Sequence, residues 1–130
     1  MKSGKFVLIF NIIVFILIIS VSLIEINLIK NDTRILGENI NNIKTSISKG
    51  DWPNAFSSIN KLNEEWEKSK HRWSLFINHK EIDNISISLK ETIQFIKNKD
   101  KSSSEASLAT LEHYIKHIYQ IERLSLENII

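Results

Sequence analysis

The feature that most constrains this chain is an apolar run, Phe6–Ile24, which contains no charged residue over nineteen positions. A helix rises about 1.5 Å per residue, so this run spans roughly 28 Å as a helix, close to the thickness of the hydrocarbon core of a bilayer. The run therefore predicts one transmembrane helix, in contact with lipid, between a short tail at residues 1–5 and a folded domain at residues 25–130.

Two lysines, Lys2 and Lys5, precede the apolar run. Positive charge beside a membrane helix is held on the cytoplasmic side, so we expect a single-pass protein of the cell membrane with a cytoplasmic N-terminus and an extracytoplasmic domain. The alternative is a secreted domain released by signal cleavage near Ser22, because Ser20 and Ser22 are small residues at cleavage spacing. Apolar character continues to Ile24, which favours an uncleaved signal anchor.

The composition excludes several classes of protein. The chain has seventeen basic and fifteen acidic residues, and all of the acidic residues follow the apolar run. Because Lys2 and Lys5 precede the run, the domain after it has fifteen residues of each charge and is neutral. A neutral domain has no excess positive charge to follow phosphates, and we expect no nucleic-acid partner. The absence of cysteine excludes disulfides, thiolate metal sites and a cysteine nucleophile.

The domain after the run shows apolar residues three and four positions apart, the period of amphipathic helices. The first helix continues from the membrane segment and ends at Gly50, and Asp51 is placed to cap a second helix. The inward positions predicted for these two helices are Leu36, Ile40, Ile43, Ile47, Trp52, Phe56, Ile59, Leu62 and Trp66, with Trp73 and Ile77 on nearly the same stripe.

Two further helices follow. A looser pattern predicts a turn at Asn78–Lys80, and a polar stretch predicts a loop at residues 98–103, so that the fourth helix begins at Ser104. The inward positions predicted for these helices are Ile82, Ile85, Leu89, Ile93, Ile96, Leu108, Leu111, Ile115 and Ile118, with Ile121 or Leu124 near the end. Short connections make neighbouring helices antiparallel, so the predicted fold class is all-α, a bundle of about four helices made of two helical hairpins.

Trp66 and Trp73 are two turns apart and lie on the same stripe of one predicted helix. Large aromatic side chains on an apolar stripe pack by default in the core. A partly exposed pair would instead form a ligand cleft or a partner surface. Both residues are therefore candidates for an interaction or ligand surface, with core packing as the simpler interpretation.

His79, Glu81 and Asp83 alternate at the predicted turn before the third helix. A histidine beside carboxyl groups can transfer protons near neutral pH, which makes the three residues candidates for a ligand or interaction surface. The simpler interpretation is that Glu81 and Asp83 lie in the first turn of a helix, where acidic side chains complement the helix dipole.

His113 and His117 have the i,i+4 spacing of a zinc-binding helix. The third ligand is missing nearby, because Glu112 is adjacent in sequence and does not lie on the same face. We therefore expect no metal site, no cofactor and no catalytic residue, and we interpret the chain as a protein other than an enzyme. A metal-dependent hydrolase would rest on these two histidines alone.

Three strings of the sequence carry a resemblance to a known family: Trp66-x6-Trp73, NHKEIDNI at Asn78–Ile85, and LSLENI at Leu124–Ile129. With the N-terminal membrane segment, they resemble a family of small bacterial proteins of the Clostridium type, domain of unknown function 4363. The resemblance implies a membrane-anchored helical architecture and brings no catalytic residue, cofactor or substrate. Within these strings the first candidates for function are Trp73, His79, Glu81, Asp83 and Asn128.

These observations predict a membrane-anchored, extracytoplasmic helical module with an interaction or structural role. It would associate with another membrane protein or with further copies of itself, held at high effective concentration by its anchor. The alternative is a ligand-binding sensor or regulatory subunit of a membrane complex, with the tryptophan region as its pocket.

Overall fold

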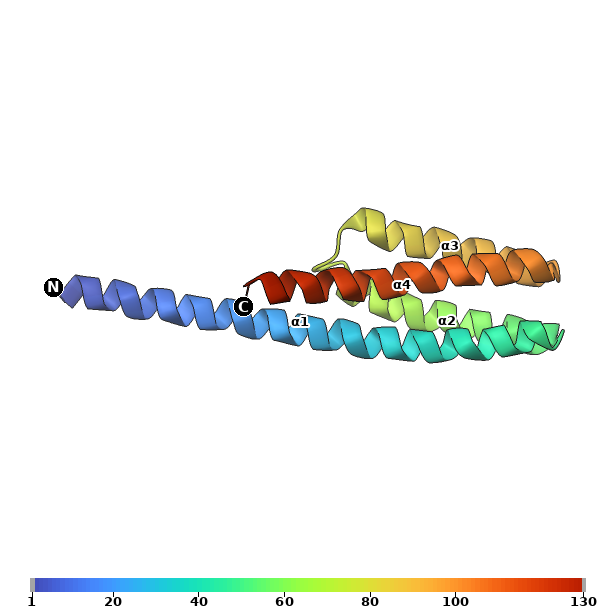
Figure 1. The fold of residues 1–130 in the computed structure, drawn as a ribbon, viewed down its shortest axis with the longest axis horizontal. Coiled ribbons are helices and arrows are strands. Elements are labelled where there is room, and N and C mark those ends of the chain that lie inside the picture. Colours follow the sequence, from blue (N-terminus) through green and yellow to red (C-terminus); the bar gives the residue numbers. More distant parts are fainter. Residues whose placement is uncertain (1, 130) are drawn as a thin grey trace.

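The computed structural model describes residues 2–129, which form four helices joined by short turns, with no strand in that range. The helices are α1 (Lys2–Ser48), α2 (Trp52–Trp73), α3 (His79–Lys97) and α4 (Lys101–Ile129). Successive helices run antiparallel (Figure 1), as the short connections require. The prediction of an all-α bundle made of two helical hairpins is therefore confirmed.

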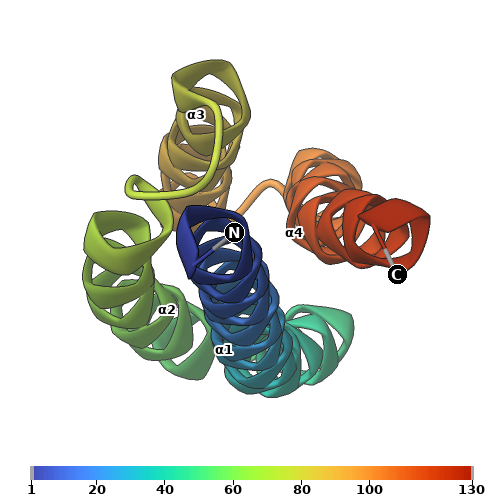
Figure 2. The same cartoon turned by 90° about the vertical axis from the view of Figure 1, so that its left-hand side faces the viewer.

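The four helices are arranged as a bundle (Figure 2), and buried apolar side chains from all four form its core. α1 packs against α2 and α4, and α3 packs against the same two helices, so α1 and α3 lie on opposite corners. The N-terminal part of α1 extends alone beyond the other three helices (Figure 1). We call the end from which it projects the anchor end of the bundle. The turns after α1 and after α3 form the opposite, distal end.

The helix α1 changes its surroundings along its length. Its large apolar side chains from Phe6 to Ile18 are exposed, whereas Ile29, Leu36 and later positions of the same helix are fully buried. Within residues 2–129, α1 is also the one helix that is long and apolar enough to cross a membrane. Because α1 is unbroken from Lys2 to Ser48, the exposed apolar half and the buried half form one continuous rod.

The turn between α1 and α2 follows the predicted capping chemistry. Gly50 has a φ of 71°, the left-handed conformation that ends a helix most easily at glycine. The Asp51 carboxyl group accepts a hydrogen bond from the backbone N–H of Asn54 at 3.3 Å and caps α2. Pro53 lies in the first turn, where its missing N–H leaves no bond unmade.

Two predicted boundaries are wrong by a few residues, and capping explains both. Asn78 caps α3 by accepting a hydrogen bond from the N–H of Lys80 at 2.9 Å, so His79 and Lys80 are helical and the turn lies earlier, at residues 74–78. Asp100 accepts a hydrogen bond from the N–H of Ser103 at 3.1 Å, so α4 begins at Lys101 and the loop is shorter than predicted. Asparagine and aspartate set helix starts more strongly than a change in apolar period does.

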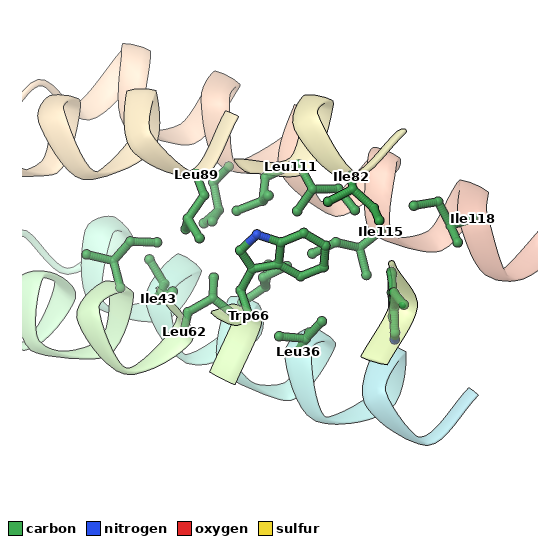
Figure 3. Close-up of a cluster of buried hydrophobic side chains, with 14 of the residues drawn as sticks. Leu36, Ile43, Leu62, Trp66, Ile82, Leu89, Leu111, Ile115 and Ile118 are labelled. Carbon is green, nitrogen blue, oxygen red and sulfur yellow. The ribbon is translucent and has the colours of Figure 1, made fainter. Parts of the chain in front are cut away.

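The core surrounds Trp66, whose indole ring lies among aliphatic side chains from all four helices (Figure 3). Most predicted inward residues are buried, but Phe56, Ile121 and Leu124 are exposed. Ala55 takes the buried position next to Phe56 on α2. Ile121 and Leu124 lie in the last three turns of α4. The C-terminal end of α4 extends beyond α2 and α3 (Figure 1).

Gly50 and Gly37 allow a matched test of this geometry, because an added methyl group meets no atom within 4 Å at either position. Gly50→Ala should destabilise the protein by about 1 kcal/mol, since alanine is strained at a positive φ. Gly37→Ala lies within α1 and should stabilise it by about 1 kcal/mol, because alanine favours helix. Urea unfolding of the full chain in detergent, followed by tryptophan fluorescence, measures both. Changes of the same sign at both positions would contradict the assigned turn.

Candidate functional site

A buried carboxyl group joins α1 to α2 near the anchor end. Asp32 is only 5% exposed. One of its oxygens accepts a hydrogen bond from Arg72 Nη2 at 2.8 Å, and the other accepts one from Trp73 Nε1 at 2.9 Å. Burial of a carboxyl group is unfavourable unless both oxygens find donors, and here each has one.

The same chain of contacts continues into α3. The rings of Trp73 and Trp66 meet edge to face, with centroids 5.5 Å apart and planes at 85°, a favoured aromatic geometry. Trp66 Nε1 donates a hydrogen bond to Ser86 Oγ at 3.0 Å. We call Asp32, Arg72, Trp73, Trp66 and Ser86 the Asp32 network. It connects three helices and gives both buried indole N–H groups a partner.

Within this network the two candidate tryptophans are part of the core. Trp66 and Trp73 are fully buried, so they offer no side-chain surface to a partner in this structure and take part in core packing. Asp32 itself was missed in the sequence, although a signal was present. It lies three positions after Ile29 and four before Leu36, so an acidic residue interrupts the apolar stripe of α1.

Near the anchor end, the turn between α2 and α3 forms an open cleft of about 290 Å³. His79 and Asp83 line it together, whereas Glu81 and Asn128 do not. The cleft, called here the His79 cleft, is lined by Glu67, Lys70, His71, Ser74, His79, Ile82 and Asp83. Lys70 is already paired with Glu67 at 3.1 Å. The arrangement offers exposed hydrogen-bonding groups of both charges, which suit a small polar ligand.

Asn128 lies apart from the other candidates. It is exposed in the last turn of α4, beside α1, whereas His79, Glu81 and Asp83 lie in the first turns of α3. The six candidate residues therefore fall into three places: the core, the start of α3 and the end of α4.

His113 and His117 stack on the surface of α4, with ring centroids 5.6 Å apart. Glu112 points elsewhere and binds Lys44 of α1 at 2.7 Å and Lys116 at 3.2 Å. Burial raises the pKa of Glu112, but the hydrogen bonds and charges of the two lysines outweigh it and hold that pKa below its ordinary value. Within residues 2–129 no three histidine or acidic side chains gather closely enough to hold a metal ion.

An acidic pair lies where α4 meets α1 at the anchor end. Glu25 of α1 and Glu122 of α4 both line a cavity of about 110 Å³, together with Ser22, Ser125 and Leu126. Burial, a hydrogen bond with Glu122 and repulsion from its charge raise the pKa of Glu25 from 4.5 to about 7. The pair is therefore held together most easily when it carries a proton.

At the distal end, a mainly apolar groove of about 360 Å³ separates the start of α2 from the end of α3. Trp52, Pro53, Phe56 and Ile96 form its apolar part, and Lys97 and Lys99 complete the lining. The sequence predicts that Phe56 faces the core, but Phe56 is exposed and contributes to an apolar surface with positive charge beside it. We call this surface the Phe56 groove.

Removal of the Asp32 carboxyl group should destabilise the bundle strongly. Asp32→Ala leaves the buried N–H of Trp73 without a partner and should cost about 3 kcal/mol. Asp32→Asn keeps an acceptor and should cost about 1–2 kcal/mol. Urea unfolding of the full chain in detergent measures both. The control Glu38→Ala breaks only the exposed Arg34–Glu38 pair and should cost less than about 0.5 kcal/mol. Equal effects of Asp32→Ala and Glu38→Ala would contradict the network.

The raised pKa of Glu25 makes the free energy of unfolding depend on pH in a defined direction. Because its pKa is raised from 4.5 to about 7 on folding, the folded chain keeps a proton that the unfolded chain has lost in this interval. The free energy of unfolding should therefore fall as pH rises from 4.5 to about 7 and change little from this source above it. Glu25→Gln should remove this part of the decline, measured by unfolding at a series of pH values. An identical decline in the wild type and in Glu25→Gln would exclude this contribution of Glu25.

Comparison with curated proteins gave no match, and comparison with solved structures gave none. A family model for a domain of unknown function, DUF4363, matches residues 23–129. This range covers α2, α3, α4 and the half of α1 that packs against them, well over half of the chain. The resemblance carried by the two tryptophans and by the strings at residues 78–85 and 124–129 is thus confirmed, and the chain belongs to the DUF4363 family.

Proposed function

We propose that this protein is a membrane-anchored, extracytoplasmic interaction module. In this proposal residues 6–24 cross the bilayer, the domain at residues 25–130 lies on its extracytoplasmic side, and the bundle binds another membrane protein without catalysing a reaction. The observation that carries the proposal is the continuity of α1, whose exposed apolar half extends directly from its buried half.

The exposure of the apolar half supports a lipid environment. Its large apolar side chains from Phe6 to Ile18 are 38–72% exposed, and the bundle covers none of the most apolar window. Water-soluble monomers rarely expose a continuous apolar surface of this length, because its hydration is unfavourable. A bilayer core would cover it completely. Lys2 and Lys5 favour the orientation with the N-terminus in the cytoplasm.

The Phe56 groove supports the interaction role. Ser48 lies twenty-four residues beyond Ile24 on a straight helix, so the distal end stands about 36 Å from the end of the apolar run. An apolar groove with Lys97 and Lys99 beside it fits an apolar segment that carries acidic groups. The partner would be a membrane protein whose extracytoplasmic part reaches that height.

The His79 cleft favours a second candidate function. Its histidines, carboxyl groups and lysine could bind a small polar ligand between α2 and α3, as a sensor or regulatory subunit would require. The buried tryptophans do not line this cleft. Substitution of His79 or Asp83, and not of a tryptophan, would therefore test whether a ligand binds there. The Phe56 groove remains the better-supported surface, because it is larger and offers apolar area to a protein.

One labelling experiment tests both parts of the proposal. The chain has no cysteine, so Phe56→Cys provides a single reactive site in the groove. Intact cells of the native host that carry this variant are treated with a membrane-impermeant, photoreactive maleimide and then illuminated. We expect labelling in intact cells, recovery of the chain in the membrane fraction, and a cross-linked product with one other membrane protein.

The matched control is Glu64→Cys, an exposed site on the same helix outside the groove, which should be labelled but should not form that product. Labelling only after cell lysis would contradict the orientation. A chain in the medium that begins near Leu23 would contradict the anchor. Cross-linking only to a second copy of the chain would replace the partner with a homo-oligomer.

A further inference from the structure

Most of the large apolar side chains that the bundle leaves exposed lie at its anchor end. Beyond the apolar run, six large apolar side chains are exposed among the described residues, and four of them lie at this end. They are Leu75 and Phe76 in the turn between α2 and α3, and Ile121 and Leu124 near the end of α4. Leu75 is 77% exposed and Leu124 is 53% exposed, so the bundle itself leaves them uncovered.

The Asp32 network fixes the height of the turn above the apolar run. Asp32 lies eight residues beyond Ile24, or about 12 Å along α1, and Trp73 binds it at that level. The chain then continues past Trp73 toward the apolar run, because α2 is antiparallel to α1 (Figure 1). Two or three further residues bring Leu75 and Phe76 to about 8 Å from the end of the run, estimated with a helical rise. The polar layer on each side of a bilayer core is roughly 5–8 Å thick.

The end of α4 lies closer still. Glu122 lies opposite Glu25, and Ser125 and Leu126 line the same cavity as Ser22, which belongs to the apolar run. The last turn of α4 therefore lies alongside residues that the anchor places within the apolar layer. The charged group at this depth, Glu127, is 3.7 Å from Arg123, which lies one turn nearer the bundle.

We propose that the anchor end of the bundle rests on the lipid surface, with Leu75 and Phe76 in the headgroup layer and Ile121 and Leu124 at the edge of the hydrocarbon core. This inference rests on the proposed anchor, since α1 brings lipid to this level. Lipid is the expected occupant because these exposed apolar side chains lie at the end of the bundle from which the apolar half of α1 projects, and because α1 leaves no flexible linker between span and bundle. The contact would hold the bundle upright and keep the Phe56 groove at a fixed height.

Depth-dependent fluorescence quenching tests this contact in the full chain. Single-cysteine variants Leu75→Cys and Leu124→Cys are labelled with an environment-sensitive fluorophore and reconstituted in phosphatidylcholine vesicles. Ile13→Cys within the run and Ser102→Cys at the distal end serve as controls. Parallel vesicles carry a nitroxide on the lipid headgroup or on the acyl chain.

We expect the headgroup nitroxide to remove most of the fluorescence at Leu75→Cys and both nitroxides to reduce it at Leu124→Cys. Ile13→Cys should respond to the acyl-chain nitroxide, and Ser102→Cys should respond to neither. If Ile13→Cys is quenched while Leu75→Cys and Leu124→Cys behave like Ser102→Cys, the docking is wrong and the anchor stands. If Ile13→Cys is also unquenched, both proposals are wrong. Phe76→Cys replaces Leu75→Cys if circular dichroism shows loss of helix.

Discussion

The rest of the structure depends on α1, a single helix that serves two environments. Its first half exposes apolar side chains on every side, and its second half supplies the central stripe of the core. Because the helix is unbroken, no flexible linker separates the bundle from the apolar half. The direction of α1 therefore sets the orientation of the other helices and their distance from the apolar half.

Apolar packing holds the helices together but specifies their register only weakly. Polar contacts specify the register at each of the four helix interfaces. In the order α1–α2, α2–α3, α3–α4 and α1–α4, these contacts are Asp32 with Arg72 and Trp73, Trp66 with Ser86, Thr92 with Ser107, and Lys44 with Glu112. A buried donor or acceptor left without its partner is costly, so a slip of one helix along another is disfavoured at the first three interfaces. The Lys44–Glu112 pair is more exposed and contributes less. The Asp32 network supplies the first two of these contacts and lies close to the anchor end, whereas the Thr92–Ser107 contact lies fully within the core.

The two ends of the bundle differ in chemistry. The distal end offers the Phe56 groove, with an apolar floor and two lysines. The anchor end combines exposed apolar side chains, the His79 cleft and the Glu25–Glu122 pair. This polarity suits a module that faces a bilayer at one end and a protein at the other, because each end carries the groups that its neighbour would cover.

The sequence by itself determined the features that depend on local order. The length of the apolar run, the helical period of the other segments and the capping residues Gly50 and Asp51 each act within a few residues, so the all-α bundle and its first turn were predictable. The tertiary structure decided which faces meet. Asp32 contacts Arg72 and Trp73, which lie 40 and 41 residues away, Ala55 replaces Phe56 in the core, and the end of α4 lies beside Ser22. These outcomes depend on the rotation and register of packed helices, which periodicity leaves free and long-range contacts fix.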